Sequence, residues 1–334
     1  MSKTNSMARQ KLLLVAGLVL IFGYAAWQIG MPLRTTRIEP VILETNHLAV
    51  LAPHRHGPND SVTDTWHHET LAARQVIAPR DMYVTGIHFN FENAPTSTIH
   101  HMSLTDVSRR NETCPNYPTG AELFSFSADR LYENEIRFPE GYALRIPKGT
   151  PLSMYIMVHN PEPPIGPGGT YKDVYTRVQL IESDQGPATL KLVHPYLLHL
   201  DDVPCSYGKA DGSEGVIFTL PARTMGYHFS GKGQNDPAAS KLFTRPATLI
   251  NLTGHLHEHQ DAKELIVRKN DQILYVFRPT PVTNDPYFSP LYRASSTFHV
   301  EAGDRVWLTA VYDNPSSVPI HGAMGAAGFY YTEE

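Results

Sequence analysis

The sequence is poor in cysteine and in charged residues for a chain of 334 residues. Only Cys114 and Cys205 are present, and neither belongs to a Cys-x-x-Cys pair, which argues against a cysteine-based zinc site and against a disulfide-dense scaffold. Charged residues make up 18% of the chain and the net charge is −5. Because the basic residues cluster no further than pairs such as Arg109-Arg110, we expect no binding of nucleic acid through a basic face.

Glycine, proline and histidine are plentiful instead. The chain contains 23 glycines and 27 prolines, which suits a loop-rich β protein better than a helical bundle, and its length allows about two domains. The 17 histidines are mostly neutral at pH 7. Their excess therefore points to packing, metal binding or proton chemistry and not to positive charge.

The N-terminus resembles a targeting segment. Residues 1–11 hold three basic residues and precede an uncharged run over 12–33, which predicts a signal anchor with a cytoplasmic N-terminus. The alternative is a cleaved signal peptide, with Gly23-Tyr24-Ala25 as the cleavage site. Either way the remainder is extracytoplasmic: periplasmic, luminal or extracellular. In such a compartment Cys114 and Cys205 either form one disulfide or remain two free thiols.

The exported part is expected to be all-β. Apolar and polar residues alternate with a period of two in several segments, and no segment keeps a helical period. The expected strands include residues 83–91, 152–159, 174–181, 190–193 and 306–312, and a hairpin over 265–277 that turns at Asn270-Asp271. In residues 83–91 we expect the odd-numbered side chains on one face and the even-numbered ones on the other. A turn-rich stretch at 183–187 divides two antiparallel, jelly-roll-like sandwich domains, 38–186 and 187–334.

Two histidine clusters could bind a metal. His255, His257 and His259 share one face if they lie in a strand, and two imidazoles at that spacing can reach one ion. The adjacent pair His100-His101 can do so only where the backbone is irregular or where the two rings use different nitrogens. The alternative is one core and one solvent-facing histidine. For His54/His56 and His67/His68, which lie in polar, loop-like segments, the interpretation without a metal is preferred.

The order of these motifs resembles a known family. Residues 97–104 (STIHHMSL), 154–159 (MYIMVH), the His255-x-His257 pair and Met324 with GAAGFYY after it occur in the order found in the copper type II, ascorbate-dependent monooxygenases. That family includes peptidylglycine α-hydroxylating monooxygenase and dopamine β-monooxygenase. The resemblance covers roughly residues 80–334. It implies two copper ions, with ligands His100, His101 and His159 in the first domain and His255, His257 and Met324 in the second.

The resemblance also implies a reaction. The first copper would take an electron from a reductant such as ascorbate, and the second, held by the catalytic residues His255, His257 and Met324, would use O₂ to hydroxylate a C–H bond of a small-molecule or peptide substrate. A thioether is a soft ligand that favours Cu(I), so the residue types fit copper. The alternative for Met324 is a buried, gap-filling side chain.

The chain departs from the peptide-amidating members at two positions. Those members grip the substrate carboxylate with a basic residue and a tyrosine, where this chain has Thr253 and Gly328. Peptide amidation is therefore not expected. We predict a membrane-anchored, extracytoplasmic dicopper monooxygenase. A non-catalytic copper-binding or copper-sensing protein, and a metal-free structural pair of sandwiches, are the alternatives.

Overall fold

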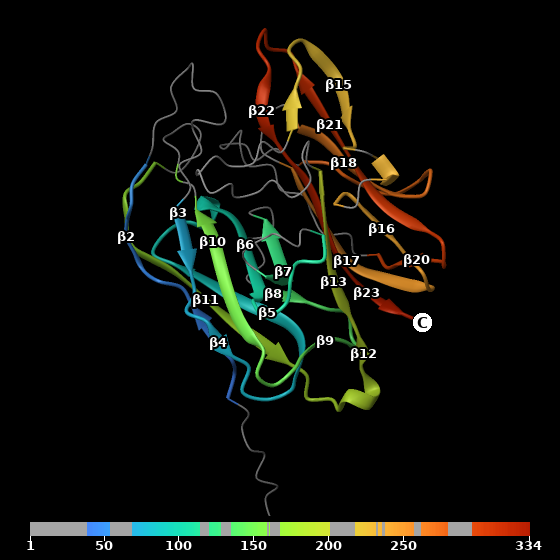
Figure 1. The fold of residues 1–334 in the computed structure, drawn as a ribbon. Helices are drawn as coiled ribbons and strands as arrows, with labels where there is room; N and C mark the ends of the chain where they lie inside the picture. The colour runs from blue at the N-terminus through green and yellow to red at the C-terminus, as the bar shows by residue number, and fades with distance from the viewer. Residues whose placement is uncertain are drawn as a thin grey trace, which may run out of the picture. The chain divides into compact units, whose positions relative to one another are not determined.

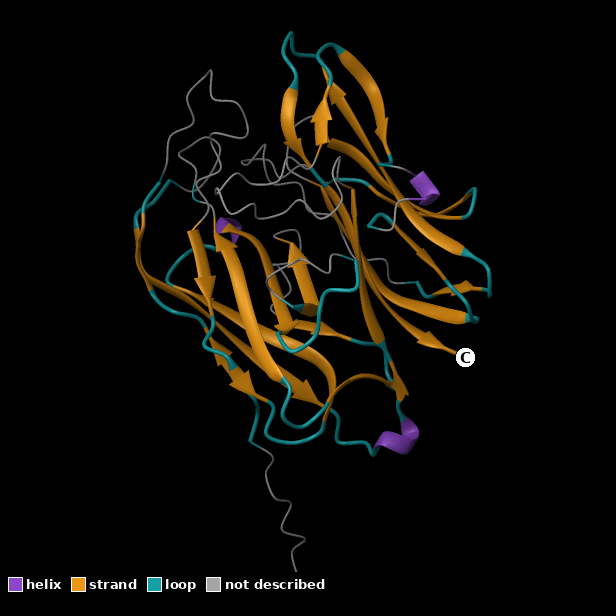
Figure 2. Ribbon diagram, in the orientation of Figure 1, coloured by secondary structure: helices purple, strands orange, loops and turns teal. Residues whose placement is uncertain are grey.

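The computed structural model describes residues 39–53, 69–113, 120–127, 135–158, 160, 168–200, 218–231, 233–235, 238–256, 262–279 and 296–334. Within these residues the elements are strands and three short 3-10 helices, which confirms the all-β expectation (Figures 1 and 2). The predicted anchor over 12–33 and both cysteines lie outside the described residues. No helix among the described residues is long and apolar enough to cross a membrane.

Two sheets share the first hydrophobic core. The larger has seven strands in the order β1-β11-β5-β9-β12, with β2 on β11 and β8 on β5; the smaller has the order β3-β10-β6-β7, with β4 on β10. Their bounds are β1 Ile42–Glu44, β2 Leu48–Leu51, β3 Glu69–Ala72, β4 Val76–Ile77, β5 Met82–Glu92, β6 Ile99–Asp106, β7 Ala121–Ser127, β8 Glu135–Arg137, β9 Tyr142–Ile146, β10 Pro151–Val158, β11 Tyr171–Glu182 and β12 Lys191–Leu192. Apolar side chains of both sheets, such as Phe89 and Leu104, are buried between them.

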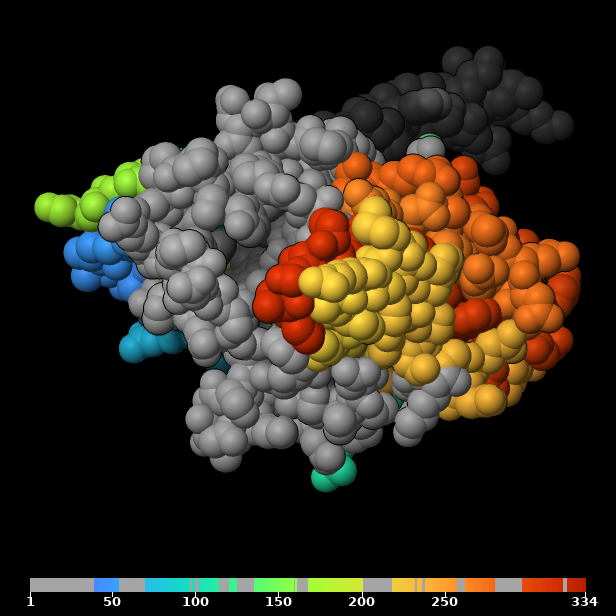
Figure 3. All heavy atoms as spheres, turned by 90° about the horizontal axis from the view of Figure 1, so that it is seen from above, coloured from blue at the N-terminus to red at the C-terminus, as the bar shows by residue number. Residues whose placement is uncertain are grey.

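Three sheets surround the second core. They are β13-β23-β17-β20, the pair β14-β22, and β15-β21-β18-β19 with β16 on β21. Their bounds are β13 His194–Leu200, β14 Phe218–Leu220, β15 Thr224–Phe229, β16 Ser240–Leu242, β17 Ala247–Leu256, β18 Ala262–Lys269, β19 Gln272–Phe277, β20 Phe298–Val300, β21 Arg305–Asn314, β22 Ile320–Ala323 and β23 Gly325–Glu333. Seen from above, the yellow surface that contains β14 and β15 lies against the red surface of the C-terminal segment, in agreement with the pairing of β14 with β22 (Figure 3).

The 3-10 helices are η1 Thr96–Thr98, η3 Pro187–Thr189 and η4 Gly233–Asn235. The first core draws on residues up to Val193 and the second begins at Leu198, but Ile250 and Tyr330 from the C-terminal half are buried in the first core. The division between residues 186 and 187 stays a prediction.

The strict alternation predicted for residues 83–91 is wrong. Met82 and Val84 are buried, and so are Ile87 and Phe89, so even-numbered and odd-numbered residues both face the core. The cause is a β-bulge, because Gly86 pairs with Ile181 whereas Val84 pairs with the next residue of β11. An extra residue shifts the alternation by one.

The hairpin prediction is confirmed. β18 and β19 are paired, and Lys269 opposite Gln272 leaves Asn270 and Asp271 as the turn. Asn270 has φ 52°, a conformation that asparagine tolerates better than most residues. The strand expected over 190–193 is shorter than predicted, because only β12 forms there.

Candidate functional site

Two β-bulges carry hydrogen bonds between the two halves of the chain, residues 38–186 and residues 187–334. On β7, Leu123 is the extra residue between the pairs Leu104–Phe124 and Thr105–Glu122. A bulge leaves a residue out of the ladder, and here the Leu123 carbonyl oxygen accepts a hydrogen bond from Tyr330 Oη at 3.1 Å. On β17 the register shifts between Ile250 and Thr253.

The β17 bulge makes the second connection. Asn251 lies in it with φ 50°, and its Nδ2 donates to the Arg137 carbonyl oxygen at 3.1 Å. Tyr330 also packs edge-on against Phe138, with ring centroids 4.6 Å apart. Each bulge therefore brings a polar group of one half to the other half.

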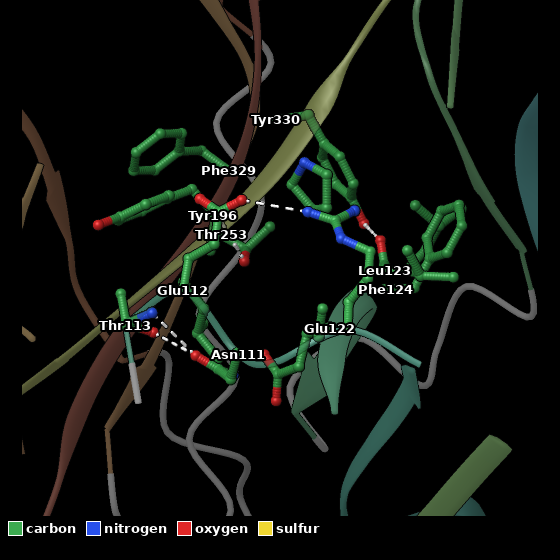
Figure 4. Close-up of a pocket in the computed structure, with 16 residues that line it drawn as sticks. Asn111, Glu112, Thr113, Glu122, Leu123, Phe124, Tyr196, Thr253, Phe329 and Tyr330 are labelled. Atoms are coloured by element: carbon green, nitrogen blue, oxygen red, sulfur yellow. Dashed lines mark hydrogen bonds and ion pairs between the residues drawn. The ribbon is translucent and has the colours of Figure 1, made fainter. Parts of the chain in front are cut away.

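A pocket lies beside these bulges. Its empty volume is about 660 Å³, including the part open to solvent. The first half contributes the segment after β6, with Arg109 and Glu112, and the β7 residues from Ala121 to Phe124; the second half contributes Leu197 of β13, Thr253 of β17 and Gly328 of β23 (Figure 4). Its full lining is Arg109, Asn111, Glu112, Thr113, Ala121, Glu122, Leu123, Phe124, Ile136, Pro195, Tyr196, Leu197, Thr253, Gly328, Phe329 and Tyr330.

The pocket contains one deeply placed carboxyl group. Glu122 Oε1 accepts a hydrogen bond from Ser103 Oγ at 3.2 Å, while Oε2 is buried. Burial raises the pKa of Glu122 to about 7, and the Ser103 hydrogen bond only partly opposes this. Glu122 can therefore carry or release a proton near neutral pH.

The solvent-exposed edge of the pocket, here called the pocket mouth, contains an ion pair between Arg109 and Glu112. Arg109 Nη2 lies 3.2 Å from Glu112 Oε1, and both side chains are about half exposed. Burial and the Glu112 charge raise the pKa of Tyr196 to about 12, so Tyr196 remains a neutral phenol. Asn111 Oδ1 accepts hydrogen bonds from Thr113 N and Oγ1.

The first predicted copper site coincides with an irregular backbone. His100 and His101 belong to β6, where Ile99 pairs with Val158 and His101 with Met157, so His100 is the extra residue of a bulge. An irregular backbone is one of the two conditions under which adjacent histidines can bind one ion, and whether this pair binds copper stays a prediction. Val158 is the residue before His159, which lies outside the described residues, as do the side chains of His100 and His101.

The second predicted site is described in part. His255 lies in β17, is 8% exposed, and pairs with Ala326 of β23; the next pair, Leu256 with Gly325, is the last that the described residues include. Met324 directly precedes Gly325 and its carbonyl oxygen accepts a hydrogen bond from Tyr312 Oη at 2.7 Å. Met324 is 5% exposed and belongs to the second core, so the gap-filling alternative stays open. His257 and His259 lie outside the described residues.

His199 was not expected near this site. It lies in β13 and pairs with Ala326, the same residue that pairs with His255 on the other side. Burial, and secondarily His255, lower the pKa of His199 to about 4. In the sequence, His199 stands between Leu198 and Leu200, both of which are buried, and this alternation indicates that its side chain lies on the opposite face of the strand. The sequence does not indicate which strand lies beside β13.

The donor types that are described fit copper. An imidazole from His255 and a thioether from Met324 are ligands that Cu(I) accepts, and a further neutral imidazole, His199, is nearby. Among the described side chains, no three His, Cys, Asp or Glu residues form a metal-binding group. The side chains of four predicted ligands, His100, His101, His159 and His257, are outside that set.

Neither a protein-family model nor a curated protein matches the chain. Among solved structures, the chain is similar to the major capsid protein P2 from bacteriophage PM2, with 9% identity, a TM-score of 0.28, and coverage of 89% of this chain and 98% of that chain. It is also similar to PNGF-II, with 10% identity, a TM-score of 0.39, and coverage of 87% and 66%. Likenesses this low carry no functional argument and give the copper monooxygenase resemblance no support.

Proposed function

We propose that this chain is a copper-dependent monooxygenase that hydroxylates a C–H bond of a small-molecule or peptide substrate with O₂ and a reductant such as ascorbate. In this proposal two jelly-roll-like domains each hold one copper ion. The N-terminal segment anchors the protein in a membrane and the copper-binding part is extracytoplasmic. The observation that carries the proposal is the strand position of two predicted ligands, His101 and His255, relative to the pocket.

One member of each predicted ligand set lies two residues from a residue that lines the pocket or is hydrogen-bonded to its lining. His101 is two residues from Ser103, in a stretch where β6 pairs regularly with β7, and Ser103 is bonded to the pocket residue Glu122. His255 is two residues from Thr253, which lines the pocket from the second half. Thr253 and His255 share a face of β17, because strand positions two apart do so. The positions of His101 and His255 in the chain support two copper sites beside one substrate pocket.

The chain's own residues would bind and orient the substrate. His100, His101 and His159 would hold one copper, and His255, His257 and Met324 the other; when bound, copper supplies electron transfer and activation of O₂. Apolar side chains of the lining, among them Leu197, would contact the apolar part of a substrate.

The two residues with which the peptide-amidating enzymes hold the substrate carboxylate are replaced here by Thr253 and Gly328. Thr253 pairs with Gly328, and its Oγ1 donates to the Gly328 carbonyl oxygen at 3.2 Å. The two positions that would grip a carboxylate are thus bonded to each other. This supports a substrate other than a peptide with a C-terminal glycine.

Oxygen consumption tests the proposal. Copper-loaded protein with ascorbate should consume O₂ faster when a substrate is present, and each O₂ should yield one hydroxylated product with one oxygen atom from ¹⁸O₂. A screen of aromatic and aliphatic compounds that yields only ascorbate-driven peroxide would contradict a monooxygenase and favour the non-catalytic copper protein.

A further inference from the structure

One face of the sheet β13-β23-β17 lines the pocket and continues beyond it. Leu197 of β13 and Thr253 of β17 both pair with Gly328 of β23, and all three residues belong to the lining. The pairing is regular from here to the end of the described ladders, so the residues two positions further along each strand project from the same face. These residues are His199, Ala326 and His255. The two histidines therefore lie beside the pocket, in the next row of side chains.

Only a small side chain separates the two histidines. His199 and His255 each pair with Ala326, which carries a methyl group, and Figure 1 shows the three strands side by side. Neighbouring strands lie about 4.8 Å apart, which places the backbones of the two histidines about 10 Å apart. Two imidazoles joined to one metal ion by bonds of about 2 Å can span that separation. The three strands thus form a place for an ion above Ala326.

The surroundings of His199 favour a ligand for its ring. Its side chain is partly buried, and no described residue forms a hydrogen bond with the imidazole. The ring is close enough to His255 for the two to interact electrostatically. A partly buried polar ring without a hydrogen-bond partner costs free energy, and a bond from its nitrogen to a metal ion would offset that cost.

We propose that His199 is a further ligand of the copper ion at the second predicted site, so that one imidazole from β13 and one from β17 bind the ion from the two sides of Ala326. The motif order assigns His255, His257 and Met324 to this site, and His199 is in no motif. That the ion is a catalytic copper rests on the proposed function. Metal binding by His199 does not require hydroxylation, so ligand counts and affinities test it separately from O₂ consumption.

X-ray absorption spectroscopy counts the imidazole ligands without a change at His199. The full-length chain with His101→Ala, which is expected to keep only the second copper, would be loaded with Cu(I). Multiple scattering should show three imidazoles per copper ion, against two if the motif residues alone bind. A count of two would overturn the inference and leave the proposed function standing. Three imidazoles, without substrate-dependent O₂ consumption by the copper-loaded wild type, would support the inference and overturn the proposed function.

Copper affinity measures the contribution of the ring. In the same His101→Ala chain, His199→Phe keeps an aromatic ring and loses the donor nitrogen, so it should lower the Cu(I) affinity about 10-fold or more. Competition with a chromophoric chelator measures this affinity. His194→Phe is the matched control, because His194 begins the same strand, is exposed and lies on the other face. Equal affinities of these two variants would overturn the inference.

A further variant keeps every donor atom. Ala326→Val adds two methyl groups between the rings, in a residue type that strands favour, and should also weaken Cu(I) binding by the His101→Ala chain. Circular dichroism of the copper-free variant checks that the sheets are retained. Unchanged affinity in a folded Ala326→Val chain would show that the ion does not lie above this residue, and would overturn the inference.

Discussion

His199 and His255 lie on opposite sides of Ala326, because both pair with this residue of β23. Directly opposite residues project from the same face of a sheet, so the two imidazoles share a face with only a methyl group between them. Two charged imidazoles this close would repel each other. This is the secondary cause of the low pKa of His199, after burial.

The first prediction concerns acid stability through His199. In the copper-free protein its pKa is about 4, below the ordinary value of 6.5, so the unfolded chain binds more protons between these pH values. The free energy of unfolding should fall by about 2 kcal/mol as the pH drops from 7 to 4, after allowance for partial solvent contact. His199→Phe should remove this part of the pH dependence. Urea unfolding at several pH values checks it, and an unchanged slope would contradict the assignment.

The second prediction concerns Glu122, whose ionisation should make the free energy of unfolding fall as the pH rises. Its folded-state pKa is raised from 4.5 to about 7, so its protonated form favours folding at low pH and this contribution is lost as the pH rises through 7. In ligand-free protein this should lower the free energy of unfolding by about 3 kcal/mol between pH 4 and pH 8. Glu122→Gln should be more stable than wild type at pH 8. If the variant is less stable than wild type at pH 8, the carboxylate has a partner and the account of its burial is wrong.

Tyr330 should couple the two halves of the chain. Tyr330→Phe removes the hydrogen bond to the bulged Leu123 carbonyl and should cost about 1 kcal/mol. Tyr330→Ala also empties its place in the first core, beside Phe124 and Phe138, and should cost about 3–5 kcal/mol. Differential scanning calorimetry would show the alanine variant unfolding in two separated transitions. A single unshifted transition would show that Tyr330 does not join the halves.

The Asn270 turn offers a comparison of two substitutions. Its Oδ1 accepts from Arg305 N, its Nδ2 donates to Asp304 Oδ1, and its φ of 52° is unfavourable for most side chains. Asn270→Gly loses the hydrogen bonds only, whereas Asn270→Ala also adopts a strained backbone. The alanine variant should therefore be about 1 kcal/mol less stable than the glycine variant. Chemical unfolding checks the order, and equal stability would show that the backbone is not strained.

Local signals predicted several of the strands, but not the face that each of their side chains takes. The Asn270-Asp271 turn is encoded by adjacent residues, so its hairpin could be recognised. The bulges at residues 85, 123 and 251 depend on how strands distant in sequence pair, and the one at residue 85 reverses the alternation that was predicted for residues 83–91. Pattern reasoning assumes uninterrupted strands and therefore could not place them.

The residues of the candidate site could likewise be predicted only in part from the sequence. His255 and Met324 could be selected because they occur in a recognisable motif order. His199 and Glu122 belong to no motif, and only the pairing of β13 with β23 and of β7 with β6 brings them to the site. A single sequence contains no direct signal for such pairings.

Copper stoichiometry tests the central claim most directly. Native mass spectrometry of the full-length, copper-loaded chain should show two copper ions per chain. The count should fall to one in His101→Ala and, separately, in His255→Ala, whereas His299→Ala, which removes an exposed histidine paired with Glu301, should keep both. Fewer than two copper ions in the wild type, or no loss in the His101 and His255 variants, would contradict the account.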